Sequence, residues 1–190
     1  MNKKGRLVII SAPSGAGKGT VIREITRLRP EIKYSVSATT RAPRPGEVHG
    51  EHYFFVSPEE FDAMVERGEF LEHETYVGNS YGTPRGPIER NIADGIDTIL
   101  EIEVKGARQV RGKIPDVISI FLAAPNEEEL RRRLIGRGTS EDTELVKRLE
   151  TAREELAASE EYAFTVVNDD ATRAAREIIA ILDFNREDYL

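Results

Sequence analysis

A glycine-rich segment that carries a single lysine is the part of the chain best suited to chemistry. Residues 12–20 read APSGAGKGT and follow directly on the apolar run Leu7–Ile10. The glycines let the backbone turn with positive φ and bring its N–H groups close to an anion, while Lys18 adds a point charge. A helical pattern opens at Thr20. Strand, glycine loop, lysine and helix form the layout of a P-loop, which binds a polyphosphate.

The loop departs from the usual pattern, G-x-x-x-x-G-K-[ST], at two places. Ala12 stands where the pattern has glycine, and Gly19 stands where it has a hydroxyl residue, which follows one place later as Thr20. The segment therefore predicts phosphate binding by backbone and Lys18, but not direct Mg²⁺ ligation by the residue after the lysine. The alternative is an ordinary glycine-rich turn between a strand and a helix.

A second candidate phosphate site lies in residues 37–46, SATTRAPRPG. Arg41 and Arg44 are held in a proline-stiffened loop, and a planar guanidinium binds an oxyanion through two parallel hydrogen bonds. Tyr53 and Tyr81 could donate hydroxyl hydrogen bonds to the same group. Alone, such a loop is more often a solvated turn. Together with a P-loop, it predicts a kinase that acts on a phosphorylated acceptor.

More arginines bracket the segment Gly136–Ser140, which reads GRGTS and suits a hinged flap between two charged helices. Residues 131–133 are consecutive arginines, so at most one or two of them can face a ligand on a helix. Arg137 lies between glycines and is the best candidate for a charge that moves inward when the flap closes. A solvated basic face balanced by Glu127–Glu129 is the alternative.

The elements that must position these residues alternate along the chain. Five apolar runs predict strands, and the helical patterns between them predict a parallel α/β sheet with ligands at the carboxyl ends of its strands. The predicted strands are Leu7–Ile10, Tyr34–Ser37, Thr98–Ile102, Val117–Leu122 and Phe164–Val167. The predicted helices are Thr20–Arg29, Pro87–Ala93, Val104–Arg111, Glu127–Ile135 and Ala171–Leu182.

Residues 38–86 break this alternation and predict a small α+β insertion. Tyr53–Val56 reads as a strand. Ser57 then precedes a proline and is followed three places later by Glu60, which is the pattern of a capping box at the start of a helix.

Composition narrows the class of protein. The chain has 190 residues, no cysteine and a net charge of −7. It is long enough for one domain with small insertions, it cannot form disulfides, and its acidity argues against a broad nucleic-acid surface. No apolar run approaches the length of a membrane span. The acidic surplus lies in helical stretches such as Glu127–Glu129 and Glu154–Glu155 and is interpreted mainly as an aid to solubility.

These segments together resemble the guanylate kinase family over residues 4–184. The S-x-T-T-R-x-P-R passage combined with a P-loop is the most specific part. The matching segments are residues 12–20, SATTRAPRPGE at 37–47, HYFFVS at 52–57, Phe70-Leu71-Glu72, GNSYGT at 78–83, ILEIEVKGA at 99–107, GRGT at 136–139 and VVNDD at 166–170.

The resemblance implies an α/β fold with a P-loop NTPase core, a parallel five-stranded sheet flanked by helices, a small α+β GMP-binding insertion and a mobile lid. The implied ranges are a core of 1–37, 87–129 and 154–190, an insertion at 38–86 and a lid at 130–153.

The resemblance also implies a role for individual residues. The implied ATP-binding residues are Ala12, Pro13, Ser14, Gly15, Ala16, Gly17, Lys18, Gly19, Thr20, Arg133, Arg137 and Asn168. Both Asn168 and Asp169 match a segment near the adenine. The implied GMP-binding residues are Ser37, Arg41, Arg44, Tyr53, Glu72, Tyr81, Thr83 and Glu103, of which Ser37, Glu72 and Thr83 would read the guanine. Lys18, Arg41, Arg137 and Arg148 are implied as catalytic. Mg²⁺ would be held by the ATP phosphates and water, with Glu101 nearby.

The implied reaction moves the γ-phosphoryl group of ATP to GMP or dGMP. A carboxylate at Glu72 can accept both guanine donors, N1–H and the 2-amino group, whereas adenine would present an unprotonated nitrogen to it. The acceptor phosphate is already anionic, so the reaction needs no general base, and His49, His52 and His73 are expected to be structural or exposed. The expected partners are ATP and GMP or dGMP, with no nucleic acid and no membrane, and the expected location is the cytoplasm.

Two other functions remain open at this point. One is a kinase for a different nucleoside monophosphate, and the other is a non-catalytic guanylate-kinase-like module for protein interactions. The oligomeric state is left undecided.

Overall fold

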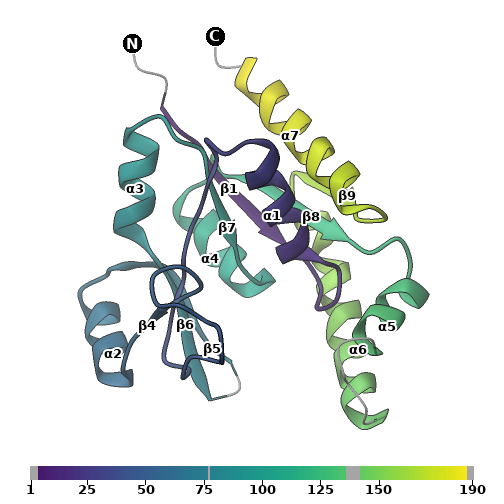
Figure 1. Cartoon of the computed structure of the whole chain (residues 1–190), viewed down its shortest axis with the longest axis horizontal. Coiled ribbons are helices and arrows are strands. Elements are labelled where there is room, and N and C mark those ends of the chain that lie inside the picture. The colour runs from purple at the N-terminus through teal and green to yellow at the C-terminus, as the bar shows by residue number, and fades with distance from the viewer. Residues whose placement is uncertain (1–3, 77, 136–141, 188–190) are drawn as a thin grey trace. The chain divides into compact units, whose positions relative to one another are not determined.

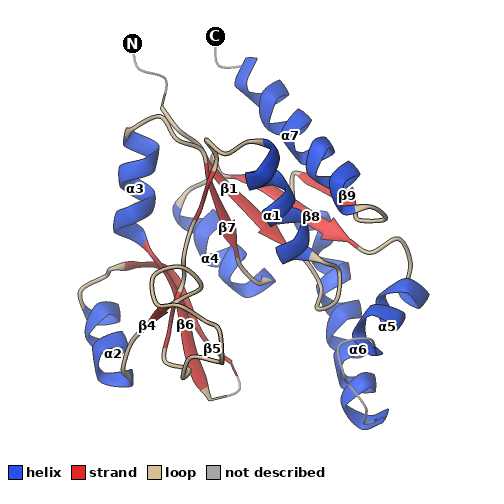
Figure 2. Ribbon diagram, in the orientation of Figure 1, coloured by secondary structure: helices blue, strands red, loops and turns tan. Residues whose placement is uncertain are grey.

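The computed structural model describes residues 4–76, 78–135 and 142–187, with the backbone alone for residues 142–148 and 186–187. Figure 1 shows the order of its elements, and Figure 2 shows helices alternating with strands. The helices are α1 Lys18–Leu28, α2 Pro58–Glu66, α3 Arg85–Ala93, α4 Val104–Lys113, α5 Glu127–Ile135, α6 Asp142–Ala157 and α7 Ala171–Glu187, with a 3₁₀ turn at Ala158–Glu161.

A five-stranded parallel sheet confirms the predicted fold class. Its strand order is β2-β7-β1-β8-β9. The strands are β1 Leu7–Ser11, β2 Lys33–Tyr34, β7 Thr98–Glu101, β8 Ile118–Ala123 and β9 Phe164–Val167. Strand β1 is buried along its whole length, as its apolar run predicts for a strand covered on both faces.

A second sheet of four strands has the order β4-β3-β6-β5. Its strands are β3 Ala38–Thr39, β4 Phe54–Phe55, β5 Phe70–Tyr76 and β6 Asn79–Pro84. Helix α2 packs on β5, and the rings of Phe61 and Phe70 stack with centroids 4.7 Å apart. The Ser57 side chain caps α2 by accepting a hydrogen bond from the Glu60 backbone at 3.2 Å, which is the predicted cap.

The strand predicted at Tyr34–Ser37 is divided between the two sheets. Lys33 and Tyr34 pair with β7, whereas Ala38 and Thr39 pair with β4 and β6. The residues between them change partner: the Ser35 N–H donates to Ile99 at 2.9 Å, and the Ser37 carbonyl accepts from Phe54 at 2.8 Å. Tertiary pairing has therefore split a segment that reads locally as one strand.

The described chain divides into two compact units. The first contains Met1–Val8, Lys33–Leu100 and Lys105–Val117, and the second contains Ile9–Ile32, Glu101–Val104 and Ile118–Leu190. The predicted ranges for core, insertion and lid remain a prediction. The segment Gly136–Ser140, expected to be a hinged flap, lies outside the described residues.

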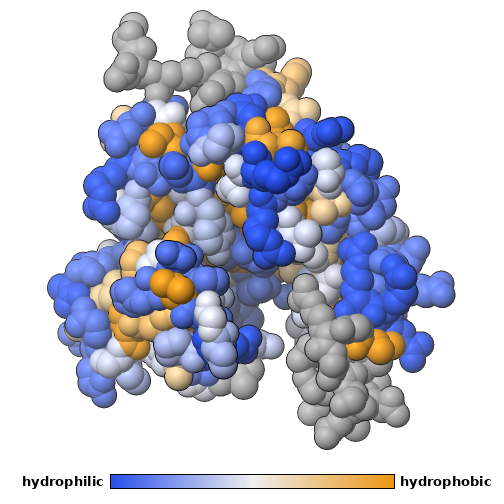
Figure 3. All heavy atoms as spheres, in the orientation of Figure 1, coloured by the Kyte–Doolittle hydropathy of each residue, from blue (hydrophilic) through white to orange (hydrophobic). Residues whose placement is uncertain are grey.

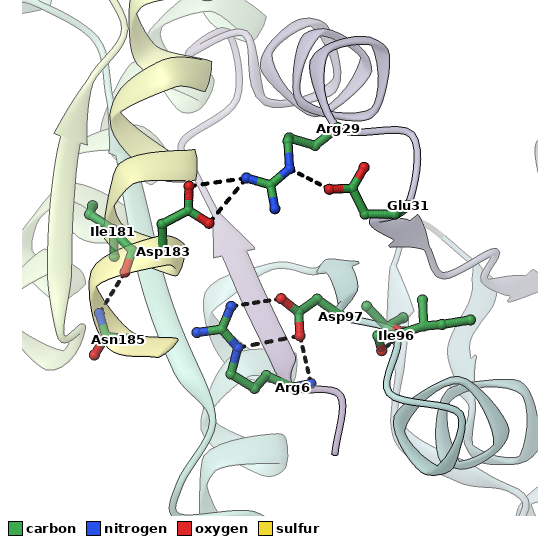
Figure 4. A network of polar contacts seen from close by, with 9 residues as sticks. Arg6, Arg29, Glu31, Ile96, Asp97, Ile181, Asp183 and Asn185 are labelled. Atoms are coloured by element: carbon green, nitrogen blue, oxygen red, sulfur yellow. Dashed lines mark hydrogen bonds and ion pairs between the residues drawn. The ribbon is translucent and has the colours of Figure 1, made fainter. Parts of the chain in front are cut away.

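In the first unit, a buried ion pair fixes the chain before β1 to the chain before β7. Arg6 donates from Nη2 to Asp97 Oδ2 at 2.6 Å and from its backbone N–H to Asp97 Oδ1 at 2.9 Å (Figure 4). The Asp97 side chain is 6% exposed and that of Arg6 is 16% exposed. Because both groups are largely removed from water, each depends on the other for compensation.

In the second unit, helices α1 and α7 pack against each other. Arg29, just after α1, donates to both carboxylate oxygens of Asp183 on α7 at 3.0 Å and also pairs with Glu31 (Figure 4). This pair is more exposed than the pair of Arg6 and Asp97, so it adds orientation more than stability.

Among the described residues, few large apolar side chains are exposed, and Tyr76 and Phe184 are the most exposed of them. On the face drawn in Figure 3, hydrophobic residues form small separate areas among hydrophilic ones. None of the helices in the described part of the chain combines the length and the apolar character needed to span a bilayer.

Candidate active site

The predicted phosphate loop connects β1 to α1 in the second unit. Gly15 and Gly17 have φ values of 89° and 90°, which favour glycine. Gly17 is also the N-cap of α1, and it has no side chain with which to satisfy the first N–H groups of the helix. Helix α1 starts at Lys18 rather than at the predicted Thr20, because the Thr20 and Val21 N–H groups both donate to the Gly17 carbonyl. The result is a helix N-terminus suited to an anion.

The Lys18 side chain is 10% exposed and lies against the carboxyl end of β7. Its Nζ donates to Glu103 Oε1 at 3.1 Å and to the Ile102 carbonyl at 3.4 Å. Glu103, implied as a GMP-binding residue, therefore acts in this structure as the counter-ion of the loop lysine. Glu101 is close to the same loop, since its Oε1 lies 3.8 Å from the position of a Cβ on Gly19.

Glu155 on α6 is a functional candidate that the sequence analysis missed. Burial and then the negative charge of Glu103 raise the pKa of Glu155 to about 7, although Lys18 and the Ser14 backbone N–H act in the opposite direction. Its Oε2 is buried and has no hydrogen-bond partner. The sequence analysis placed Glu155 in a solvated acidic stretch. In the structure Glu155 lies three residues after the buried Ala152, on the same side of α6, and nothing local in the sequence indicates this.

The three consecutive arginines at 131–133 differ in how exposed their side chains are. Arg131 and Arg132 are exposed, and only Arg133 of this triplet is half-buried, which agrees with the expectation that few of them can face inward. Arg133 Nη1 and Asn168 Nδ2 both donate to the Ala16 carbonyl of the loop, at 3.3 and 2.6 Å.

The resemblance implies four more residues for the ATP site or for catalysis: Asp169, Thr20, Arg137 and Arg148. Asp169 pairs with Arg173 at 2.6 Å, and that arginine lowers the pKa of Asp169. Thr20 is exposed. Arg137 lies outside the described residues, and so does the side chain of Arg148, whose backbone belongs to α6.

The predicted acceptor phosphate site lies in the first unit. The Arg41 guanidinium carbon lies 5.4 Å from the centre of the Tyr53 ring, and the Tyr53 and Tyr81 rings are 6.2 Å apart. Glu47 raises the pKa of Arg41, and Tyr81 adds to this effect. Three of the four residues predicted to bind this phosphate therefore lie together. The fourth, Arg44, is exposed on the same loop.

Glu47 is the residue that organises this arginine loop. One of its carboxylate oxygens accepts from Arg41 Nη2 at 2.9 Å, and the other accepts from the Arg44 backbone N–H at 2.7 Å. The charge of Arg41 lowers the pKa of Glu47, so it stays ionised at neutral pH. Glu47 belongs to the segment SATTRAPRPGE, and no role was predicted for it. Its loop position, three residues after Arg44, was the available signal.

The predicted base-reading residues form a buried pair in the same unit. Glu72 on β5 is 7% exposed and accepts a hydrogen bond from the Thr83 hydroxyl on β6 at 2.5 Å. Burial raises the pKa of Glu72 above its ordinary value, while the Thr83 hydroxyl partly opposes this. Ser37 is half-buried just before β3.

Gly106 on α4 makes room for the Glu72 carboxylate, a role that the sequence analysis did not assign. A Cβ at this position would lie 2.7 Å from Glu72 Oε2. Glycine in a helix is normally unfavourable, so its presence in the ILEIEVKGA segment was a signal of close contact.

The three histidines accept backbone hydrogen bonds or are exposed, as expected. Nδ1 of His52 accepts from the Val48 backbone at 3.1 Å, and Nδ1 of His49 accepts from the Phe55 backbone at 3.2 Å. His73 is exposed on β5.

Within the part of the chain that the structure describes, no group of three or more His, Cys, Asp or Glu side chains could hold a metal ion. Mg²⁺ usually binds through one or two carboxylates together with substrate phosphates and water. The Glu101 carboxylate close to Gly19 of the loop is a ligand type that fits this kind of site.

Comparison with known proteins gives a consistent result. The family model for guanylate kinase matches residues 4–184. A guanylate kinase from Rubrobacter xylanophilus is 52% identical over 180 residues, which cover 95% of this chain and 94% of that protein. A guanylate kinase from Thermobifida fusca is 50% identical over 177 residues, covering 93% and 90%. The crystal structure of guanylate kinase from Anaplasma phagocytophilum matches with a TM-score of 0.79 and 35% identity, covering 96% of this chain and 87% of that one. The chain therefore belongs to the guanylate kinase family.

Proposed function

We propose that this enzyme transfers the γ-phosphoryl group of ATP to the phosphate of GMP, giving ADP and GDP. The observation that carries the proposal is the buried Glu72 carboxylate, which lies in the same unit as the cationic site of Arg41. The first unit thus offers an anion for the base and a cation for the phosphate, which is the polarity that a guanine nucleotide requires.

Glu72 explains the choice of guanine over other bases. Its carboxylate can accept from N1–H and from the 2-amino group, and these bonds would offset the burial that now raises its pKa. Adenine has no proton on N1 and would leave the buried Glu72 carboxylate without a donor from the base. A polar mismatch of this kind can discriminate by roughly 10⁴-fold.

Arg41 and Arg44, with the hydroxyls of Tyr53 and Tyr81, would hold the phosphate of GMP. Glu47 keeps the Arg41 guanidinium in place before the ligand arrives, so less side-chain entropy is lost on binding. Ser37 and Thr83 would complete recognition of the base. Glu103 would lie near the nucleoside, which requires it to exchange its present contact with Lys18.

The loop N–H groups and Lys18 would bind the phosphates of ATP. Lys18 would then exchange Glu103 for the phosphate oxygens, where its charge offsets the charge that develops during transfer. The acceptor oxygen is already an anion, so alignment and charge neutralisation account for the rate without a general base. Arg137 and Arg148 are proposed to add positive charge during catalysis.

We also propose that Mg²⁺ accompanies ATP, held by its phosphates and water close to Glu101. Mg²⁺ bound there would supply positive charge that offsets the charge on the phosphate oxygens. The proposal further includes dGMP as an acceptor and the cytoplasm as the site of action, since a chain without cysteine suits a reducing compartment.

A coupled assay with ATP and Mg²⁺ over GMP, AMP, CMP and UMP tests the proposal. We expect turnover with GMP alone and a loss of at least 10²-fold in the Lys18→Ala variant, because removing one preorganised charge commonly costs this much. Preference for another acceptor would indicate a kinase for a different nucleotide. Absence of turnover with any acceptor, combined with absence of ATP binding in calorimetry, would indicate an interaction module.

A further inference from the structure

The carbonyl of Ala16 in the phosphate loop is the focus of two long-range hydrogen bonds. Asn168 Nδ2 donates to it at 2.6 Å and Arg133 Nη1 donates to it at 3.3 Å. These residues are 152 and 117 positions away in the sequence. Two donors on one carbonyl hold the direction of that peptide group, since a carbonyl oxygen has two lone pairs.

Both donors are themselves fixed. Asn168 is 4% exposed, and its backbone N–H donates to the Ala123 carbonyl at the end of β8 at 2.8 Å. Arg133 donates from Nε to Glu129 at 2.7 Å and from Nη2 to the Asn168 carbonyl at 3.0 Å. The two side chains therefore act as a preorganised clamp, which we call the Ala16 clamp and define as Asn168 and Arg133.

The direction of the Ala16 carbonyl decides where the next N–H points. In a trans peptide the C=O and N–H bonds point to opposite sides, so the Gly17 N–H points away from the Ala16 clamp. Gly17 has a φ of 90° and, as a glycine, can adopt other backbone orientations at little cost. Without the clamp, this peptide could turn over and present its carbonyl where the N–H had been.

Gly17 itself is required by the clamp. A Cβ on Gly17 would lie 2.5 Å from Asn168 Nδ2. The residue that makes the loop flexible is therefore the one that lets Asn168 approach closely enough to hold it. Gly17 thus gives the loop its conformational freedom and also permits the contact with Asn168 that restrains it.

We propose that Asn168 and Arg133 are positioning residues that keep the Ala16–Gly17 peptide turned with its N–H toward the ATP phosphates. This inference rests on the proposed function, because it takes the loop as the ATP site. A flipped peptide would present a carbonyl oxygen to a polyanion, which repels it and removes one donor. The family resemblance places Asn168 near the adenine, whereas its burial and its short bond to Ala16 assign it to the phosphate loop.

Binding of ATP and of inorganic tripolyphosphate, measured by calorimetry, separates these two roles. Asn168→Asp keeps the shape of the side chain but replaces the donor by an oxygen that repels the Ala16 carbonyl. We expect the dissociation constants for ATP and for tripolyphosphate to rise by the same factor, at least tenfold, while that for GMP changes less than twofold. Weaker binding of ATP with unchanged binding of tripolyphosphate would identify an adenine contact and overturn the inference.

Arg133→Gln provides a second test, and Arg132→Gln is its matched control. Both changes remove one positive charge from neighbouring positions on α5, and both side chains pair with Glu129. Arg133 also donates to the Ala16 carbonyl, whereas the Arg132 side chain is 77% exposed. We expect at least a fivefold loss of tripolyphosphate affinity for Arg133→Gln and less than twofold for Arg132→Gln. Equal losses would attribute the effect to general charge and overturn the clamp.

Failure of the inference can be told apart from failure of the proposed function. If the natural chain phosphorylates GMP but Asn168→Asp lowers only the melting temperature and leaves both affinities unchanged, the clamp is merely structural and the inference alone is wrong. If the natural chain binds neither ATP nor tripolyphosphate, the proposed function is wrong and the inference falls with it.

Discussion

Carboxylates lie at both of the proposed nucleotide sites. Glu72 is buried in the first unit, where it pairs with the Thr83 hydroxyl. Glu103 and Glu155 lie beside Lys18 in the second unit, where anionic phosphates would have to compete with them. Burial raises the pKa of Glu72 and that of Glu155, whereas the Glu103 side chain is 62% exposed. Substitutions at these three carboxylates are therefore expected to have different effects.

Glu72→Gln should reduce kcat/KM for GMP by roughly 10²-fold, because an uncharged amide accepts guanine donors less strongly than a carboxylate. The melting temperature should not fall, since burial already disfavours the charged form of Glu72. Steady-state kinetics and thermal unfolding measure the two effects. Glu74→Gln on the same strand is the control and should change kcat/KM less than twofold. An equal loss in both variants would contradict the role of Glu72 in reading the base.

Helix α4 allows a matched test with two glycines. A Cβ at Gly106 would lie 2.7 Å from Glu72 Oε2, whereas a Cβ at Gly112 meets nothing within 4 Å. Gly112→Ala should stabilise the fold by about 1 kcal/mol through helix propensity. Gly106→Ala should displace the Glu72 carboxylate and lower kcat/KM for GMP at least tenfold despite the same gain in propensity. Urea unfolding and the GMP assay measure both variants. Unchanged kinetics in Gly106→Ala would show that this contact is not needed.

Helix α6 links the stability of the second unit to pH through Glu155. Its pKa is about 7 in the folded chain and 4.5 ordinarily, so the folded state holds this proton more tightly than the unfolded state. The favourable contribution is present in full below pH 4.5 and is lost as the pH rises to 7. Above that, the ionised carboxylate destabilises the fold.

Glu155→Gln should therefore melt a few degrees higher than the natural chain at pH 8 and differ little from it at pH 5. Thermal unfolding across this pH range is the measurement. The exposed neighbour Glu154→Gln is the control, and its difference from the natural chain should not depend on pH in the same way. Parallel pH profiles for Glu155→Gln and the natural chain would contradict the buried environment of Glu155.

Elements whose signals are local could be predicted from the sequence. The run Leu7–Ile10, the glycine loop and the presence of a helix after it follow from residues that are neighbours in the chain, and so does the Ser57 cap. The start of α1 was wrong by two residues, since the helix begins at Lys18 and not at Thr20. The strand expected at Tyr34–Ser37 was wrong in extent, because its two ends pair in different sheets.

The supports of the candidate site could not be predicted, because they depend on contacts between distant segments. Nothing near Gly106 in the sequence indicates that Glu72 lies against it, and nothing near Ala16 indicates that Asn168 holds its carbonyl. The family resemblance implied which residues bind the nucleotides, but not which residues hold them in position. The burial of Glu155 could not be predicted from composition, because a glutamate in an acidic stretch is expected to be solvated unless the packing of its helix is known.

At the scale of the whole molecule, each compact unit carries one of the two proposed nucleotide sites. The first unit holds Arg41 and Glu72, and the second holds the loop with Lys18. Transfer of a phosphoryl group needs both sites at once, so the integrity of each unit is a condition for activity. In the first unit, the largely buried pair of Arg6 and Asp97 joins the segment before β1 to the segment before β7.

Asp97→Asn should lower the free energy of unfolding by about 3 kcal/mol, because it leaves the largely buried Arg6 guanidinium without its charge partner. Urea unfolding followed by circular dichroism measures the loss. Asp94→Asn, an exposed position just after α3, is the control and should stay within about 0.5 kcal/mol. A loss below about 1 kcal/mol for Asp97→Asn would mean that solvent reaches this pair in solution.

The most direct measurement is a competition assay in which ATP and Mg²⁺ are supplied with an equimolar mixture of GMP, AMP, CMP and UMP, and the products are separated by chromatography. We predict that GDP forms with an equal amount of ADP, and that CDP and UDP stay at background. ATP cleavage that yields free phosphate without GDP, or consumption of another monophosphate in preference to GMP, would contradict the account.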